Sequence, residues 1–284
     1  MSRTLGALAG HVAQDAHTRC TMLRLDLVDG TTLAITDHNK NLGFDLGDGS
    51  VTYSANTGIL PSDLSLAVGF DGTDIEVEGP IGETVTRTAV LGGRYDDATA
   101  RLFQVNWARL TDGAAKLLKG RVVLAEVVGG RFKLTIHSEA SRFAQTIGRT
   151  ITAYCDADFG DARCGETPIS DSVTVTAVTD ERSFTTTNPS ARANDFFNKG
   201  RVTFTAGALN GTRPVEIYDW TSGGVVTLWT GLAEPPVIGD TLTLKQGCAK
   251  TRAACLAYDN VVNFRGFPDV PGSDQVLRYP NPGG

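Results

Sequence analysis

The sequence predicts a mainly β protein with a few short helices, and two observations predict this class. Apolar and polar residues alternate in many short runs, which is the pattern of half-buried strands. Gly, Pro, Asn or Asp bound most of these runs and would end each strand in a turn. Helical spacing of apolar residues is confined to brief segments, so the alternating runs decide the fold class.

Residues 5–16 show helical spacing. Apolar side chains recur at intervals of three and four, which places them on one face of a helix. They are Leu5, Leu8, Ala9, Val12, Ala13 and Ala16. We therefore expect a short helix ahead of the first strands.

The spacing then changes to two. Leu23, Leu25 and Leu27 alternate with charged residues, Asp29-Gly30 supplies a two-residue turn, and the alternation resumes at residues 33–35. A turn of this type between alternating runs predicts a β-hairpin.

Further strands are predicted in the same way at 74–79, 101–110 and 121–137, the last with a turn at Gly129-Gly130. A short helix is predicted over 138–148, with Ser138 as its N-cap and Gly148 at its end. Residues 1–150 are thus expected to form an N-terminal antiparallel β domain with a helix near each end.

Residues 169–245 form a second β-rich block, expected to be a small barrel or sandwich. Its predicted strands lie in "SVTVTAVTD", "RSFTTT", "GRVTFTAG", "PVEIYDW", "GVVTLWTG" and "DTLTLKQG". The flanking residues, 151–168 and 246–284, lack strong periodicity and would form one small irregular domain into which the β block is inserted. Such a domain cannot bury an apolar face, so something else must hold it together.

Four cysteines lie in these flanking segments, in pairs spaced C-x8-C and C-x6-C. They are Cys155 with Cys164, and Cys248 with Cys255. The polar N-terminal segment is unlike a secretory signal, so we expect the protein to be assembled in a reducing cytoplasm. Disulfides are rare there, and clustered cysteines are first candidates for metal ligands.

Thiolates suit soft metals, so two kinds of centre fit four cysteines. A structural zinc site usually pairs ligands two to four residues apart, whereas these spacings are longer and suit the corners of an iron–sulfur cluster. Spacing alone leaves iron–sulfur, zinc and unligated or disulfide-bonded cysteines open.

Composition limits the function classes. The chain has 284 residues, 41% hydrophobic content and a net charge of −6, which describes a folded protein and argues against a dedicated nucleic-acid binder. No apolar run approaches the roughly 20 residues that span a bilayer. Nucleophile elbows, phosphate-binding loops and dinucleotide fingerprints are missing from the sequence.

Other reactive side chains are expected to be structural. Cys20, near His11 and His17, is interpreted as a buried strand residue rather than a nucleophile. Asp37 and His38 are interpreted as loop residues whose polar side chains form local hydrogen bonds, rather than as an acid–base couple. His137 and the tryptophans are expected to be ordinary structural residues, the latter as core or interface anchors: Trp107, Trp220 and Trp229.

Two motifs carry a resemblance to a known family. The second cysteine pair is followed by "YDNVVNFRGFPDVPG" (258–272), and residues 36–64 contain "TDHNKNLGF" and "VTYSANTGILPSDL". Together with the cysteine spacing they resemble the tail-tip, or baseplate, hub proteins of long-tailed phages, of the phage lambda tail tip protein L type. The similarity is greater to the hub proteins of alphaproteobacterial gene transfer agents.

This resemblance implies a virion structural protein at the tail tip, not an enzyme. It implies a 4Fe-4S cluster held by Cys155, Cys164, Cys248 and Cys255. It also implies a homotrimer between the distal tail protein ring and the central fibre protein, around a channel that DNA passes without specific binding, assembled in the bacterial cytoplasm. The alternatives are an iron–sulfur or zinc-dependent redox enzyme and a binding module stapled by zinc.

Overall fold

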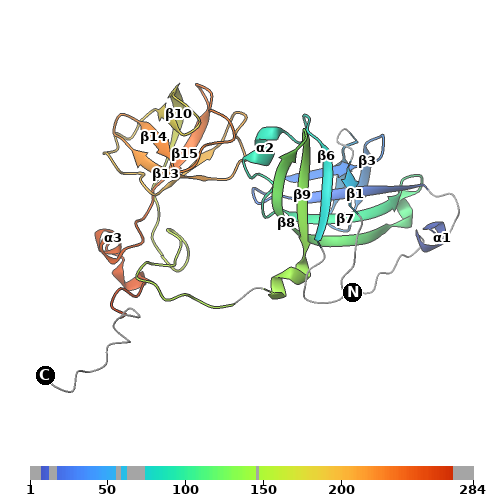
Figure 1. Ribbon diagram of the computed structural model, residues 1–284, viewed down its shortest axis with the longest axis horizontal. Helices are drawn as coiled ribbons and strands as arrows, with labels where there is room; N and C mark the ends of the chain where they lie inside the picture. Colours follow the sequence, from blue (N-terminus) through green and yellow to red (C-terminus); the bar gives the residue numbers. More distant parts are fainter. Residues whose placement is uncertain (1–7, 13–17, 56–58, 63–73, 145–146, 271–284) are drawn as a thin grey trace, which may run out of the picture. The chain divides into compact units, whose positions relative to one another are not determined.

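The computed structural model describes residues 8–12, 18–55, 59–62, 74–144 and 147–270. The chain divides into two compact units, residues 1–146 with 211–213 and residues 147–210 with 214–284. Both units are built from strands with a few short helices (Figure 1), so the predicted fold class is confirmed at this level. In the described part of the chain, no helix is both long and apolar enough to span a bilayer.

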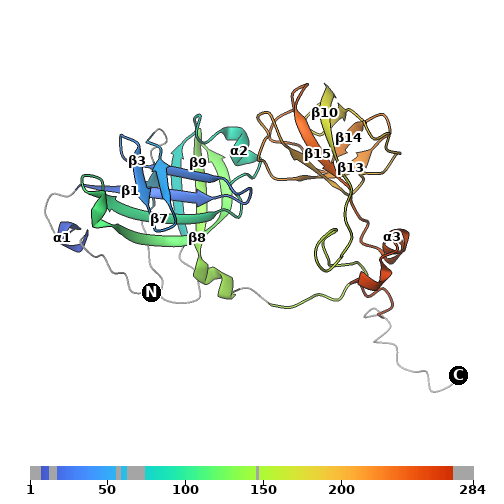
Figure 2. The same ribbon diagram turned by 180° about the vertical axis from the view of Figure 1, so that it is seen from behind.

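The first unit is an antiparallel sheet with strand order β2-β1-β7-β8-β9-β6-β5, which curls into a half-barrel (Figure 2). The strands are β1 (Arg19–Asp26), β2 (Thr32–Thr36), β5 (Leu60–Pro61), β6 (Asp74–Pro80), β7 (Thr99–Asn106), β8 (Ala114–Val128) and β9 (Arg131–Ser138). A separate hairpin pairs β3 (Leu42–Asp45) with β4 (Ser50–Tyr53). The helical elements are α1 (Leu8–Val12), α2 (Arg87–Leu91), η1 (Leu110–Asp112) and η2 (Glu139–Ala144).

The predicted hairpins of this unit are confirmed. Strands β1 and β2 pair with Leu25 opposite Leu33. Strands β8 and β9 meet at Gly129-Gly130, whose φ angles are 56° and 79°. A two-residue turn of this type needs positive φ at both positions, which glycine adopts without steric cost.

Alternation along these strands places one set of side chains in the core. Leu23, Leu25 and Ile35 from the first hairpin are fully buried with Phe132 and Ile136 from β9. A second cluster on the other side of the β1–β7 pairing includes Cys20, Met22, Tyr53 and Phe103. The sheet therefore buries apolar side chains on both faces over part of its area.

Three predicted elements differ in extent or type. The expected helix 5–16 is seen as α1, and its remaining residues lie outside the described ranges. The expected strand 101–110 ends at Asn106 and is followed by a 3₁₀ turn. The expected short helix 138–148 is present as the 3₁₀ helix η2, which covers 139–144. Ser138 pairs with Gly120 as the last residue of β9 and directly precedes this helix.

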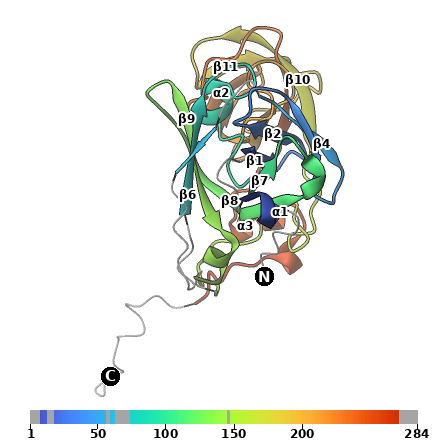
Figure 3. The same ribbon diagram turned by 90° about the vertical axis from the view of Figure 1, so that its right-hand side faces the viewer.

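The second unit contains a closed antiparallel barrel with strand order β10-β11-β14-β13-β12-β15. Two of its strands, β10 and β11, are labelled at the top of Figure 3. Its strands are β10 (Ser170–Val178), β11 (Ser183–Thr186), β12 (Arg201–Phe204), β13 (Val215–Trp220), β14 (Val225–Leu228) and β15 (Thr241–Lys245). Each predicted strand of the 169–245 block is present, and barrel rather than sandwich is the outcome. Trp220 and Phe184 fill the interior with β-branched and leucine side chains.

The two cysteine-bearing segments, one before the barrel in the chain and one after it, lie together at one end of the barrel (Figures 1 and 2). They contain two short helices, α3 (Arg252–Ala257) and η3 (Val261–Asn263), and otherwise irregular backbone. The division of the unit into a barrel and a separate cysteine domain stays a prediction.

Candidate metal centre

Pairing of the first and last barrel strands brings the two cysteine segments together. Ser170 of β10 lies opposite Lys245 of β15, so the chain enters and leaves the barrel at neighbouring points. The two segments then continue side by side: the Cys155 amide donates to the Lys250 carbonyl at 2.8 Å, and the Phe267 amide donates to the Thr152 carbonyl at 2.8 Å. Pairs about 80 residues apart in the sequence thus meet because the barrel closes.

All four predicted ligands line one cavity. Cys155, Cys164, Cys248 and Cys255 are each half-buried, and the cavity has an empty volume of about 370 Å³, part of it open to solvent. Its other lining residues are Ala157, Phe159, Lys250, Thr251, Tyr258, Asn260, Asn263 and Phe264. Each of the five cysteines lies within the described ranges and is a free thiol.

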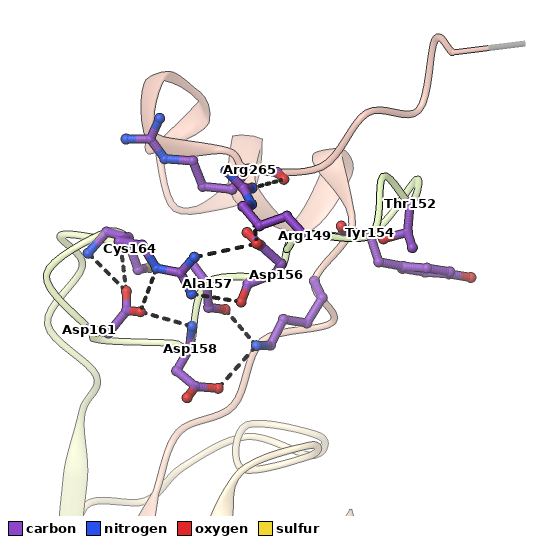
Figure 4. Close-up of polar contacts among 11 residues, drawn as sticks. Arg149, Thr152, Tyr154, Asp156, Ala157, Asp158, Asp161, Cys164 and Arg265 are labelled. Atoms are coloured by element: carbon purple, nitrogen blue, oxygen red, sulfur yellow. Dashed lines mark hydrogen bonds and ion pairs between the residues drawn. The ribbon is translucent and has the colours of Figure 1, made fainter. Parts of the chain in front are cut away.

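Asp161 shapes the loop between the first two cysteines. Its carboxylate accepts hydrogen bonds from the amides of Cys164 at 2.7 Å, Arg163 at 3.0 Å and Asp158 at 3.2 Å (Figure 4). The Cys164 amide is the largest of the causes that lower the pKa of Asp161. An ionised Asp161 therefore fixes the backbone that presents Cys164.

Charged side chains fasten this loop to its surroundings. The Asp156 carboxylate forms ion pairs with the guanidinium groups of Arg149 at 2.8 Å and Arg163 at 3.3 Å. Lys250, from the second segment, donates to the Ala157 carbonyl at 2.5 Å and lies 3.4 Å from a carboxylate oxygen of Asp158 (Figure 4). The Lys250 contacts join the loop to the cysteine segment that follows the barrel, whereas the arginine contacts hold the loop within its own segment.

Asn260 joins the second pair to the first. Its side-chain amide donates to the Cys164 carbonyl at 2.7 Å, and its backbone amide donates to the Cys255 carbonyl at 3.0 Å. Asn263 donates to the Asn260 side-chain oxygen at 2.7 Å and so fixes its orientation. Sequence reasoning did not single out either asparagine, although both lie in the "YDNVVN" part of the motif after Cys255.

The sulfur atoms themselves have polar neighbours. The Lys250 amide lies 3.4 Å from Cys248 Sγ, and the Asn260 side-chain amide lies 3.8 Å from Cys164 Sγ. The Cys255 thiol donates to the Asn260 carbonyl at 3.0 Å. Amide donors near thiolate sulfur are one means by which proteins adjust an iron–sulfur centre.

Electrostatics in the cavity disfavour four bare thiolates. Burial raises the pKa of Cys255, and the charges of Cys155, Cys248 and Cys164 raise it further. A bound cation reverses this effect, since it favours the deprotonated thiol. As the side chains stand, however, no group of three or more His, Cys, Asp or Glu among the described residues could hold a metal ion. The cysteines share a cavity wall without forming a ready coordination shell.

The remaining reactive residues belong to the first unit, whereas the four cysteines belong to the second. Cys20 is 4% exposed, and burial raises its pKa to about 11, so it is protonated at neutral pH. Asp37 accepts the Thr21 amide at 2.8 Å, and burial is the main reason that its pKa is raised. His38 contacts the backbone of Lys40 and the ring of Trp107. These are the local contacts expected of structural residues.

His11, His137 and the tryptophans also have structural surroundings. His11 accepts the Thr18 amide at 2.9 Å, and His137 lies 3.5 Å from Asp74. Trp220 is a core residue at 1% exposure, as expected. Trp107 and Trp229 are 41% and 53% exposed, so they are not core residues.

Comparison with known families identifies the class of protein. A family model described as "Baseplate hub protein, N-terminal attachment domain" matches residues 6–167, which is more than half of the chain. The chain belongs to this family of baseplate hub proteins. A second model, described as "Phage conserved hypothetical protein BR0599", matches residues 195–274, which include the second cysteine pair.

A solved structure is similar over nearly the whole chain. It comes from the "Virion of native gene transfer agent (GTA) particle", with 26% sequence identity and a TM-score of 0.82. The match covers 98% of this chain and 96% of that chain. The resemblance expected from the sequence motifs is therefore confirmed. The curated proteins contain no match to the sequence.

Proposed function

We propose that this protein is a structural hub at the tip of a phage-like tail. The observation that carries the proposal is the whole-length similarity to a chain of a gene transfer agent virion, at a TM-score of 0.82 with 98% of this chain covered. Similarity over both units supports a shared architecture, rather than one borrowed domain on an unrelated protein.

The proposed hub joins the ring of the distal tail protein to the central fibre protein, around the channel that DNA follows. Closed cyclic symmetry suits a part that links a tube to one central fibre, and a homotrimer is the proposed state. The attachment-domain match at residues 6–167 supports a role for the first unit in docking to the tail.

The cysteine cavity is proposed to hold a structural 4Fe-4S cluster through Cys155, Cys164, Cys248 and Cys255. The support is that the donors are all sulfur and line one cavity, together with Ala157, Phe159 and Phe264, which limit water access. When bound, the cluster would supply four metal–thiolate bonds that cross-link the two segments. A bound group has to bridge these sulfurs or draw them together, which a cluster does over a wider span than one zinc ion.

In this arrangement the chain's own residues position the ligands. Asp161 fixes the loop that carries Cys164, and Asn260 ties that loop to the segment of Cys255. Lys250 places its backbone amide near Cys248 and its ammonium group on the first loop. Together they bring the cysteine segments to one place before any group is bound.

Particles purified from the producing cells test the hub proposal. We expect the chain in stoichiometric amounts in intact particles and at the tail tip in a reconstruction. Absence from purified particles, or turnover as a cytoplasmic oxidoreductase, would refute it.

Metal analysis of protein purified without oxygen tests the cluster separately. We expect a brown protein with broad thiolate-to-iron absorption, and iron and sulfide in equal amounts. Stoichiometric zinc without iron, in protein from iron-replete cells, would assign the site to zinc and leave the hub proposal intact.

A further inference from the structure

A second, larger groove lies in the second unit beside the cysteine cavity. Its empty volume is about 1,090 Å³, much of it open to solvent. The barrel contributes three cations and one carboxylate to its lining, and the cysteine segments contribute two aromatic residues and a further cation and carboxylate. They are Lys199, Arg201, Lys245 and Glu216 from the barrel, and Tyr154, Phe159, Lys250 and Asp158 from the cysteine segments. The groove borders the cysteine cavity and shares four lining residues with it, Cys155, Phe159, Cys248 and Lys250. The barrel residues of the groove take no part in the proposed metal site.

Three of the four cations in the groove have no ion-pair partner in the part of the chain that the structure describes. Lys250 is engaged by Asp158, but Lys199, Arg201 and Lys245 are exposed and lie within 4 Å of no carboxylate oxygen. Other arginines of the strands are paired, for example Arg24 with Asp48 at 2.8 Å. Unpaired cations are therefore gathered here in a protein of net charge −6.

The strand register makes this gathering unfavourable without an anion. Arg201 of β12 lies directly opposite Lys245 of β15, and both side chains point outward because Val202 and Leu244 point into the core. Like charges directly opposite each other destabilise a sheet. Glu216 lies opposite Arg201 on the other side, yet the two side chains form no ion pair. An anion between Arg201 and Lys245 would relieve the repulsion.

We propose that this groove binds the phosphate backbone of a nucleic-acid strand. Arg and Lys side chains on one wall can contact successive phosphates, and the arginine fork suits phosphate oxygens. The groove also includes aromatic residues, and Tyr154 is 61% exposed with its ring directed away from the polar contacts of the loop (Figure 4). Cations and an exposed aromatic ring in one groove are the combination that single-strand-binding grooves use. An acidic peptide, the other candidate, would not need the exposed ring of Tyr154.

The number of unpaired cations sets how steeply binding should depend on salt. Three unpaired cations give about three phosphate contacts, so the logarithm of affinity should fall with the logarithm of salt with a slope of about −2 for a single strand. Binding should be clear at low salt and weak at physiological salt. The proposal stands on the groove alone and does not rest on the place of this protein in a tail.

Fluorescence anisotropy of the full chain with a labelled oligonucleotide of about 16 nucleotides tests the site. Affinity should drop by about 16-fold between 50 and 200 mM salt. The double variant R201Q/K245Q should reduce the slope to about −0.7 and weaken low-salt binding by about tenfold or more. E216Q should tighten binding by about twofold, because it removes a carboxylate beside Arg201.

K116Q/K119Q is the matched control, because it removes two exposed lysines of β8 outside the groove. It should leave the slope unchanged. An equal loss in both double variants would mean diffuse charge attraction and overturn the site. Binding of a poly-glutamate peptide at the groove with no oligonucleotide binding would overturn the nucleic-acid assignment. A tightened E216Q argues for the site even if R201Q/K245Q folds poorly.

Discussion

At the residue scale, the cysteines differ from one another in what surrounds them. Four line a common half-buried cavity, whereas Cys20 is buried in a strand of the first unit. Spacing in the sequence was enough to separate the four from the fifth. It could not reveal Asn260 and Asn263, because asparagines in a loop give no periodic signal. The role of Asn260 depends on Cys164, 96 residues away, and Asn263 acts through Asn260.

Replacing any one of Cys155, Cys164, Cys248 or Cys255 by Ser should release bound iron and unfold the irregular segments. These segments bury few apolar side chains, so ligand binding supplies their folding free energy. Iron content and protease resistance of residues 246–270 measure the effect.

Cys20→Ser is the matched control for these variants. It buries a hydroxyl in place of a thiol and should cost about 1–2 kcal/mol while leaving bound iron unchanged. Loss of iron in the Cys20 variant, or full retention in the other four, would contradict the assignment of four ligands and one bystander.

At the element scale, strands were predictable and helices were less so. Alternation over four or more residues located every strand of the barrel, because burial on one face imposes a period of two. The helix predicted over 138–148 is present as a 3₁₀ helix at 139–144, but local helix signals did not show that Ser138 continues a strand pairing. Closure of the barrel was also hidden, because which strands become neighbours depends on pairing between distant segments, such as β10 with β15.

The start of α3 depends on one side chain. Thr251 Oγ1 accepts the Ala254 amide at 3.2 Å and caps the helix that carries Cys255. Thr251→Ala should destabilise this helix by about 1 kcal/mol, whereas Thr251→Ser should be nearly neutral because serine keeps the acceptor. Thermal melting of the second unit and iron retention at raised temperature would show the difference. Equal effects of Ala and Ser would mean that the cap contributes nothing.

A bidentate ion pair should make the barrel sensitive to acid. Arg192 donates to both carboxylate oxygens of Asp171 at 2.8 and 2.9 Å, and the Asp171 side chain is 10% exposed. The Arg192 hydrogen bond is the largest cause that lowers the pKa of Asp171. The pKa is lower in the folded state, so the contribution is complete above the unfolded value near 4 and is lost as pH falls through the folded value.

Asp171→Asn should therefore cost about 1.5–3 kcal/mol at pH 7 and should cost less as the pH approaches 3. Chemical denaturation of the second unit at several pH values measures this change. Asp269→Asn is the control, because Asp269 is 86% exposed beside Arg252 and such a pair contributes little. A cost for Asp171→Asn that stays constant with pH would contradict the ion-pair explanation.

At the scale of the whole molecule, the acidic balance bears on how DNA is handled. The net charge of −6 repels phosphate over most of the surface. Duplex DNA should therefore bind weakly or not at all at physiological salt, because few cations are free to contact it. Filter binding or anisotropy with a duplex in 150 mM salt measures this. Submicromolar duplex binding there would contradict a role as a channel wall that DNA passes.

The expected assembly state follows from the proposed role of a tail hub rather than from the amino-acid composition. A hub that joins a tube to a single central fibre has to close on itself, and only a cyclic arrangement presents the same surface to every neighbour. We therefore expect a particle reconstruction to place this chain as a trimer beneath the distal tail ring, with the first unit toward the ring. The second unit would carry the cysteine centre toward neighbouring tail-tip subunits. Isolated protein can remain monomeric without contradiction, because ring closure can require the partner surfaces. A reconstruction with this chain on the capsid, or as a single copy outside the tail axis, would refute the proposed assembly.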